Sequence, residues 1–135
     1  MTNLLKQMKK IYIVEDNPDI GFILGYFLKE EGFDVSLFAT VKEFKEGLTS
    51  GPPDIFLLDV MLPDGDGVVL CDQLKGNSST LHIPVIIMSA HANIEKIGRE
   101  NRANDVIHKP FDLDVMLSKI NEQLDEAKPS KNLSL

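Results

Sequence analysis

The chain is short of several residue types, and each shortage excludes a class of protein. A single cysteine, Cys71, rules out an intramolecular disulfide and a cysteine-rich metal site. No apolar run approaches the length that crosses a membrane, and residues 1–10 lack the apolar stretch and cleavage site of a secretion signal. Positive charge is in deficit, and a net charge of −7 would repel nucleic-acid phosphates. We therefore expect a cytoplasmic protein with no membrane insertion and no direct contact with nucleic acid.

The composition is that of an ordinary globular domain. Of the 135 residues, 43% are hydrophobic and 26% are charged, which suits one packed core and argues against disorder. The sequence has no internal repeat, low-complexity tract or linker. We expect one folded domain over residues 10–127, preceded by an N-terminal extension over 1–9 and followed by a flexible tail over 128–135. Because nothing after residue 127 is long enough to fold alone, we expect no output domain.

Short apolar runs rich in branched side chains alternate with segments of helical periodicity. Strands are predicted over residues 11–14, 33–38, 55–59, 85–88 and 106–109. Helices are predicted after Asn17, over 41–49, 67–75 and 93–101, and after Asp112. Five such units predict an α/β fold with a doubly wound five-stranded parallel sheet and helices on both faces. The flavodoxin-like strand order 2-1-3-4-5 would place the first and third strands side by side.

Ionisable residues gather at the carboxyl ends of the predicted strands, where open α/β sheets bind ligands. Glu15 and Asp16 follow the first strand, Asp59 ends the third, and Lys109 ends the fifth. Three converging carboxylates repel one another, and Mg²⁺ is the hard cation that best compensates them. Lys109 would anchor phosphate oxygens as a point charge. Ser89, at the end of the fourth strand, adds a hydroxyl group. Any one of these acids alone would more simply be part of a solvated rim.

Four short motifs occur in order along the chain, and together they are specific. They are Glu15-Asp16, Asp59-x-x-x-Pro63-x-x-x-Gly67, Met88-Ser89-Ala90 and Lys109-Pro110-Phe111. With these motifs the chain resembles a response-regulator receiver domain of two-component signalling over residues 9–127, of the single-domain type found in chemotaxis. The resemblance implies a phosphorylation-activated signalling switch rather than an enzyme that turns over an external substrate.

The resemblance also implies a role for each residue of the metal site. Asp16, Asp59 and the main-chain carbonyl of Met61 would bind Mg²⁺, with Glu15 acting through a water molecule. Asp59 would accept a phosphoryl group from the phosphohistidine of a sensor histidine kinase or a histidine phosphotransfer protein.

The phosphoryl oxygens would be bound by Ser89 and Lys109, and positioning with charge neutralisation is most of what phosphoryl transfer requires. By the same resemblance, Met61 and His91 would flank the phosphoryl group and tune its lifetime. The switch would then control a downstream protein target by contact.

Two positions depart from the usual receiver pattern. Val106 stands where receivers carry a tyrosine or phenylalanine, and Arg102 stands where a glycine is common. The usual inward turn of an aromatic ring therefore cannot transmit the signal, which motivates an alternative: a receiver-like binding module whose partner binding is independent of phosphorylation. A dehalogenase-like phosphohydrolase is disfavoured because Met61 stands where that class has a second aspartate. A nucleotide-binding protein is disfavoured because no glycine-rich loop follows the first strand.

Overall fold

The computed structural model describes residues 9–126 of the chain. The expected flexible tail and all but the last residue of the expected N-terminal extension lie outside the described residues, so the predicted domain boundaries remain predictions. Within the described part, no helix is both long enough and apolar enough to cross a bilayer.

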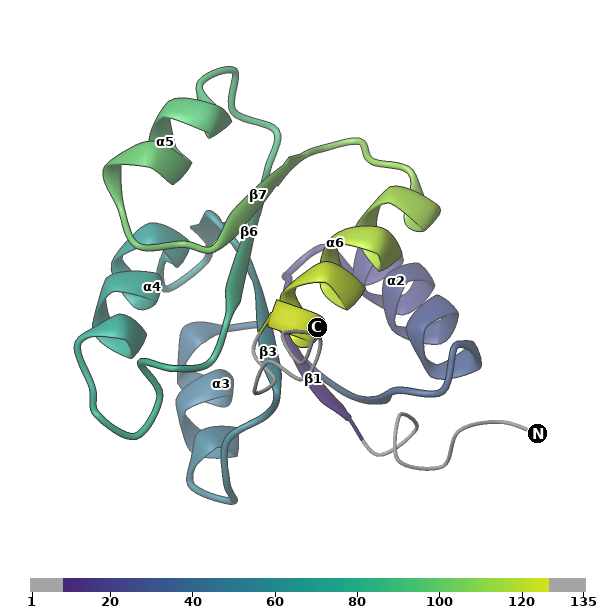
Figure 1. Cartoon of the computed structure of the whole chain (residues 1–135), viewed down its shortest axis with the longest axis horizontal. Coiled ribbons are helices and arrows are strands. Elements are labelled where there is room, and N and C mark those ends of the chain that lie inside the picture. The colour runs from purple at the N-terminus through teal and green to yellow at the C-terminus, as the bar shows by residue number, and fades with distance from the viewer. Residues whose placement is uncertain (1–8, 127–135) are drawn as a thin grey trace, which may run out of the picture.

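A five-stranded parallel sheet forms the centre of the fold (Figure 1). Its strands are β1 (Lys10–Val14), β2 (Asp34–Phe38), β3 (Ile55–Asp59), β6 (Val85–Ser89) and β7 (Asp105–His108). They lie in the order β2-β1-β3-β6-β7, and each neighbouring pair is parallel. This order confirms the predicted α/β fold and the predicted 2-1-3-4-5 layout.

Helices cover both faces of the sheet. On one face lie α2 (Pro18–Glu30) and α6 (Leu113–Glu126), and on the other lie α3 (Val41–Leu48), α4 (Gly67–Lys75) and α5 (Ile94–Glu100). Figure 1 shows the first pair to the right of the sheet and the other three helices to its left. The crossovers thus enclose the sheet on both sides, as parallel strands require.

Two hydrophobic cores lie on opposite faces of the sheet because side chains alternate along a strand. On β1, Ile11 and Ile13 face the α2–α6 side, whereas Tyr12 and Val14 face the other helices. All residues of β3 and β6 are buried, which accounts for their unbroken apolar sequences. Burial of each large aliphatic side chain contributes ~1.5–3 kcal/mol to stability. These central strands therefore hold the residues at their ends in fixed positions.

The boundaries of α2 follow from its end residues. Asn17 is the N-cap, and its Oδ1 accepts hydrogen bonds from the main-chain N–H groups of Asp19 at 2.9 Å and Ile20 at 3.1 Å. Pro18 occupies the first helical position, as predicted. The chain turns away at Gly32, whose φ of 101° is readily adopted only by glycine.

One element was not expected from the sequence. The segment predicted as a loop after Asp59 contains a short antiparallel pair of strands, β4 (Met61–Leu62) and β5 (Gly65–Asp66). Helix α4 begins directly after it. This small hairpin fixes the path of the chain beside the phosphoacceptor candidate.

Candidate functional site

The predicted acidic residues converge at the carboxyl edge of the sheet. Because β1 pairs with β3, Glu15 and Asp16 at the end of one strand lie beside Asp59 at the end of the other. One oxygen atom from each of the three carboxylates lies within 4.8 Å of the others. Glu15 and Asp59 are buried, whereas Asp16 is exposed. The arrangement is a carboxylate cluster that opens to solvent on one side.

Lys109 reaches into this cluster from the far edge of the sheet. Its Nζ lies 2.7 Å from Glu15 Oε1 and 2.9 Å from Asp59 Oδ2. Its main-chain N–H donates to the carbonyl of Ser89 at 2.9 Å, which extends the β6–β7 ladder by one residue. The peptide bond between Lys109 and Pro110 is cis. The side chain is only 14% exposed, so the ammonium group is a buried counter-charge.

The charges in the cluster shift one another's pKa values. Burial raises the pKa of Glu15, and the negative charge of Asp59 adds to this rise, although Lys109 and the Asn17 N–H oppose it. For Lys109, burial alone would lower the pKa, but the hydrogen bonds and charges of Glu15 and Asp59 outweigh it and raise the pKa. The ammonium therefore stays charged at neutral pH, and a single positive charge faces three carboxyl groups.

Two carboxylate oxygens in the cluster lack a regular hydrogen bond to the described residues. Glu15 Oε1 is buried and makes its ion pair with Lys109 without a hydrogen bond of regular geometry. Among the described residues, Lys109 bonds to Oδ2 of Asp59 and nothing bonds to Oδ1. Carboxylate oxygens are hard donors of the kind that Mg²⁺ prefers.

Ser89 is buried at the end of β6 and offers a hydroxyl proton to the same edge. Its Oγ accepts a hydrogen bond from the His91 N–H at 2.9 Å. The Nδ1 atom of His91 accepts from the Asn93 N–H at 3.0 Å, so in the neutral ring the proton is on Nε2. The Ser89 hydroxyl hydrogen has no acceptor among residues 9–126. It is therefore free to donate to an incoming anion.

Gly67 packs so closely against Asp59, the candidate phosphoacceptor, that a side chain would not fit at this position. A Cβ atom at this position would overlap with the main-chain carbonyl oxygen of Asp59. The Gly67 N–H donates to the carbonyl of Val60 at 2.8 Å. The start of α4 is thereby seated directly on the end of β3, with Asp66 as its N-cap.

Asp64 is a structural residue of the site that the sequence did not indicate. Its carboxylate accepts hydrogen bonds from the N–H groups of Val41 at 2.8 Å and Lys42 at 3.0 Å, at the first turn of α3. These bonds, the one from Val41 foremost, lower the pKa of Asp64. These hydrogen bonds connect the β4–β5 hairpin to α3. No local sequence motif predicts them, because Asp64 and the first turn of α3 are more than 20 residues apart.

The other positions singled out in the sequence make no hydrogen bond or ion pair to these carboxylates within residues 9–126. The Met61 side chain is 79% exposed, and the role of its carbonyl remains a prediction. Val106 lies in β7 against α5, where a Cβ atom at Gly98 would lie 2.5 Å from Val106 Cγ1. Arg102 donates to the carbonyls of Lys75 at 3.1 Å and Asp72 at 3.3 Å, at the C-terminal end of α4.

The sequence has clear relatives. The family model described as the response regulator receiver domain matches residues 11–121. The chain belongs to this family. The predicted resemblance and its place in two-component phosphorelay signalling are therefore confirmed.

Individual relatives agree with this assignment. The response regulator ArlR of Staphylococcus saprophyticus is 36% identical over 128 residues, which cover 93% of this chain and 56% of that protein. The receiver domain of a signal transduction histidine kinase from Syntrophus aciditrophicus is 30% identical, with a TM-score of 0.83 over 95% of this chain and 98% of that one. The receiver domain of the sensor histidine kinase PA1611 from Pseudomonas aeruginosa was solved with a magnesium ion coordinated in its active-site cleft. It is 25% identical, with a TM-score of 0.76 over 87% of this chain and 98% of that one. The chain spans about half the length of the curated relatives it matches.

Proposed function

We propose that this receiver domain is a signalling switch that is phosphorylated on Asp59. One observation carries the proposal: Lys109 holds Oδ2 of a buried aspartate, while Oδ1 of the same carboxylate has no hydrogen bond within the described residues. The lysine fixes the orientation of the carboxylate, and the free oxygen is the atom that would attack. The same cluster carries more negative than positive charge, so its resting arrangement favours a cation.

Mg²⁺ is the cofactor that suits these donors. Glu15 Oε1 is a buried acceptor without a regular hydrogen bond, and the three carboxylates offer oxygens within 4.8 Å of one another. We propose that Asp16, Asp59 and the Met61 carbonyl bind the ion and that Glu15 acts through a water molecule. The magnesium ion in the cleft of the PA1611 receiver supports this assignment. When bound, the ion would neutralise charge on the phosphoryl oxygens.

The chemistry needs few groups beyond these. Asp59 Oδ1 attacks the phosphorus of a phosphohistidine, the new O–P bond forms, and the P–N bond breaks as the imidazole leaves. Lys109 Nζ would transfer its contacts from the carboxylates to a phosphoryl oxygen, and Ser89 would donate its hydroxyl hydrogen to another. Hydrolysis of the acyl phosphate resets the switch, so the domain turns over no substrate except its own phosphoryl group.

The phosphoryl donor would dock beside the mouth of the crevice. Phe22, Ile23 and Tyr26 on α2 are 70%, 53% and 60% exposed, which is unusual for large apolar side chains placed together. The rings of Phe22 and Tyr26 stack with centroids 6.3 Å apart. Next to them a pocket of about 290 Å³ is lined by residues that include Ile23, Lys109 and Phe111. We propose that a sensor histidine kinase or histidine phosphotransfer protein contacts this surface in the cytoplasm.

Phosphotransfer from a radiolabelled histidine phosphotransfer protein tests the proposal. Label should pass to this chain in the presence of Mg²⁺ and fail to pass when EDTA is added. Asp59→Asn should accept no label, whereas Asp54→Asn, which changes the aspartate directly before β3, should accept it normally. Transfer of label to Asp59→Asn would refute the assignment of the acceptor.

The packing around Val106 favours a second function. Val106 fills the space that the missing side chain of Gly98 leaves, and position 106 itself carries no aromatic ring that could turn inward. A module that binds its downstream protein target equally well with or without phosphorylation would need no such ring. Measuring partner affinity with and without beryllofluoride separates the two functions, since only the switch predicts a change in affinity.

A further inference from the structure

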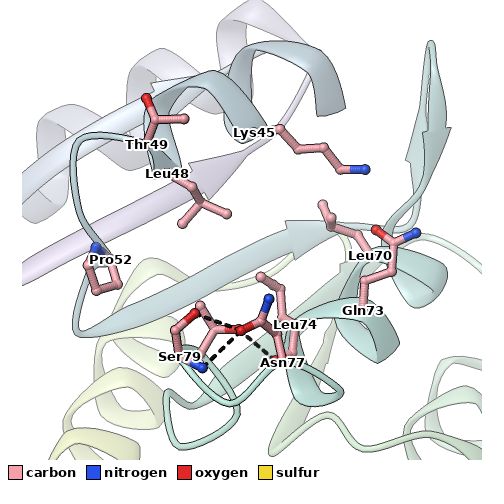
Figure 2. A pocket seen from close by; sticks show the side chains of 10 residues that line it. Lys45, Leu48, Thr49, Pro52, Leu70, Gln73, Leu74, Asn77 and Ser79 are labelled. Atoms are coloured by element: carbon pink, nitrogen blue, oxygen red, sulfur yellow. Dashed lines mark hydrogen bonds between the residues drawn. The ribbon is translucent and has the colours of Figure 1, made fainter.

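A second pocket lies between α3 and α4, away from the acidic crevice (Figure 2). Its volume is about 370 Å³. The walls come from the second half of α3, the start of the following loop, α4, and the loop before β6. The lining residues are Lys45, Leu48, Thr49, Pro52, Leu70, Gln73, Leu74, Asn77, Ser79 and Thr80.

This pocket is distinct from the phosphorylation site because it belongs to the opposite edge of the sheet. The segment with Thr49 and Pro52 leads into the first residue of β3, and the segment from Asn77 to Thr80 precedes β6. Asp59, in contrast, is the last residue of β3. A ligand in the α3–α4 pocket would therefore leave the crevice open.

The floor of the pocket is apolar, and its hydroxyl groups are already paired. Leu70 and Leu74 are buried in α4, with Leu48 facing them from α3. The hydroxyls donate to acceptors of the protein itself: Thr49 to the Glu46 carbonyl, Thr80 to the Leu74 carbonyl, and Ser79 to Asn77 Oδ1. Figure 2 shows the bonds between Ser79 and Asn77. Because these hydroxyl groups already donate hydrogen bonds within the protein, the apolar part of a ligand can lie against them without leaving a donor unpaired.

Lys45 is the one ionisable residue in the lining. Among residues 9–126 no carboxylate forms a salt bridge with it, although it interacts electrostatically with Asp64. The Gln73 amide makes no hydrogen bond with the described residues either. Figure 2 shows Lys45 and Gln73 at one end of the pocket and Pro52 at the other. A chain with a net charge of −7 thus places an ammonium that has no salt bridge within the described residues at one end of an apolar hollow.

We propose that the α3–α4 pocket binds a small amphipathic carboxylate. The apolar body would lie on Leu48, Leu70 and Leu74, and the carboxylate would pair with Lys45 and accept a hydrogen bond from Gln73. The volume of about 370 Å³ is at the small end of the range for small-molecule sites. The small volume, the apolar floor and the lysine at one end therefore favour a small molecule with one negative charge.

Titration of the ¹⁵N-labelled protein with octanoate tests this proposal. Amide shifts should move at Leu48, Leu70, Leu74 and Thr80 and saturate, whereas octylammonium at the same concentrations should leave these shifts unchanged. Lys45→Gln should weaken octanoate binding by about fivefold, the worth of one exposed ion pair. The matched control is Lys42→Gln, which neutralises an exposed lysine on α3 outside the pocket and should leave the affinity unchanged.

A blocking variant keeps the test decisive. Gln73→Trp replaces an exposed helical side chain with a bulky one that obstructs the pocket, and it should abolish the saturable shifts while the thermal unfolding midpoint stays close to that of the parent. Three results would overturn the proposal: octylammonium binding as tightly as octanoate, no loss of affinity in Lys45→Gln, or octanoate shifts that persist in Gln73→Trp. None of these readouts depends on phosphorylation of Asp59.

Discussion

Lys109 Nζ lies 2.9 Å from Asp59 Oδ2, although 50 residues separate the two in the sequence. The contact exists because β3 and β7 both flank β6, so that Asp59 at the end of β3 and Lys109 directly after β7 lie at the same edge of the sheet. The lysine also reaches Glu15 at 2.7 Å and so links the ends of β1, β3 and β7. The following predictions depend on this three-strand junction and on the packing around it.

Replacing Lys109 with methionine should destabilise the fold. Glu15 and Asp59 would remain buried without their counter-charge, and breaking a buried pair in this way costs about 3 kcal/mol. Urea unfolding at pH 7 measures the loss. The matched control is Lys119→Met, which removes a more exposed ion pair to Asp105 at 3.2 Å and should cost less than about 1 kcal/mol. Equal losses in the two variants would contradict the importance given to Lys109.

Mg²⁺ should raise the thermal unfolding midpoint of the chain, because an ion bound only to the folded state stabilises it. At a concentration 100 times its dissociation constant, the gain is about 2.7 kcal/mol. Asp16→Asn should remove most of this gain, since it deletes the exposed carboxylate of the cluster. Asp19→Asn, an acidic residue in the first turn of α2, is the control and should keep the full gain. An unfolding midpoint that does not change when Mg²⁺ is added would contradict Mg²⁺ binding to the folded chain.

Gly67→Ala should be strongly destabilising. The added methyl group would overlap with the Asp59 carbonyl, and both atoms belong to backbone that cannot easily move. We expect a loss of about 3 kcal/mol, the upper range for overpacking. Gly25→Ala is the control, because its Cβ would lie 3.9 Å from Val35 Cγ1 in ordinary contact within α2. That change should be neutral or stabilise by up to about 1 kcal/mol, and chemical denaturation compares the two variants.

Cys71 should make the fold sensitive to alkaline pH. Burial, aided by the charge of Asp72, raises the pKa of the thiol from 9.0 to about 11 in the folded chain. The folded state therefore keeps its thiol proton more tightly than the unfolded state. This contribution to stability is full below pH 9 and is lost as the pH rises to about 11, with a change of about 3 kcal/mol.

The measurement is the free energy of unfolding of the parent and Cys71→Ala between pH 8 and about 11. Cys71→Ala should start lower, because it leaves a small cavity, but its stability should fall less steeply over this range. Parallel curves for the two proteins would show that the thiol does not titrate in this way.

The sheet and the convergence of the site residues could be predicted from the sequence. The unbroken apolar runs before Asp59 and Ser89 mark central strands, and parallel strands necessarily bring their carboxyl ends together. Asn17 and Pro18 marked the start of α2 because caps are local and depend on neighbouring residues alone. These signals need no knowledge of distant contacts.

The individual side-chain contacts between distant segments could not be predicted. Asp64 looked like a loop residue, yet it caps α3 across more than 20 residues. Nothing in the periodicity announced that Lys109 would pair with Glu15, or that Val106 would fill the space beside Gly98. The β4–β5 hairpin was missed because two-residue strands are too short for an alternating pattern to emerge.

The central claim is that Asp59, and no other carboxylate, accepts a phosphoryl group when Mg²⁺ is present. Incubation with acetyl phosphate, followed by intact mass spectrometry and peptide mapping at low pH, measures this directly. The account predicts the mass of one added phosphoryl group on the peptide that contains Asp59, absent with EDTA and absent in Asp59→Asn. An unmodified mass in the presence of Mg²⁺, or a phosphoryl group that remains in Asp59→Asn, would contradict it.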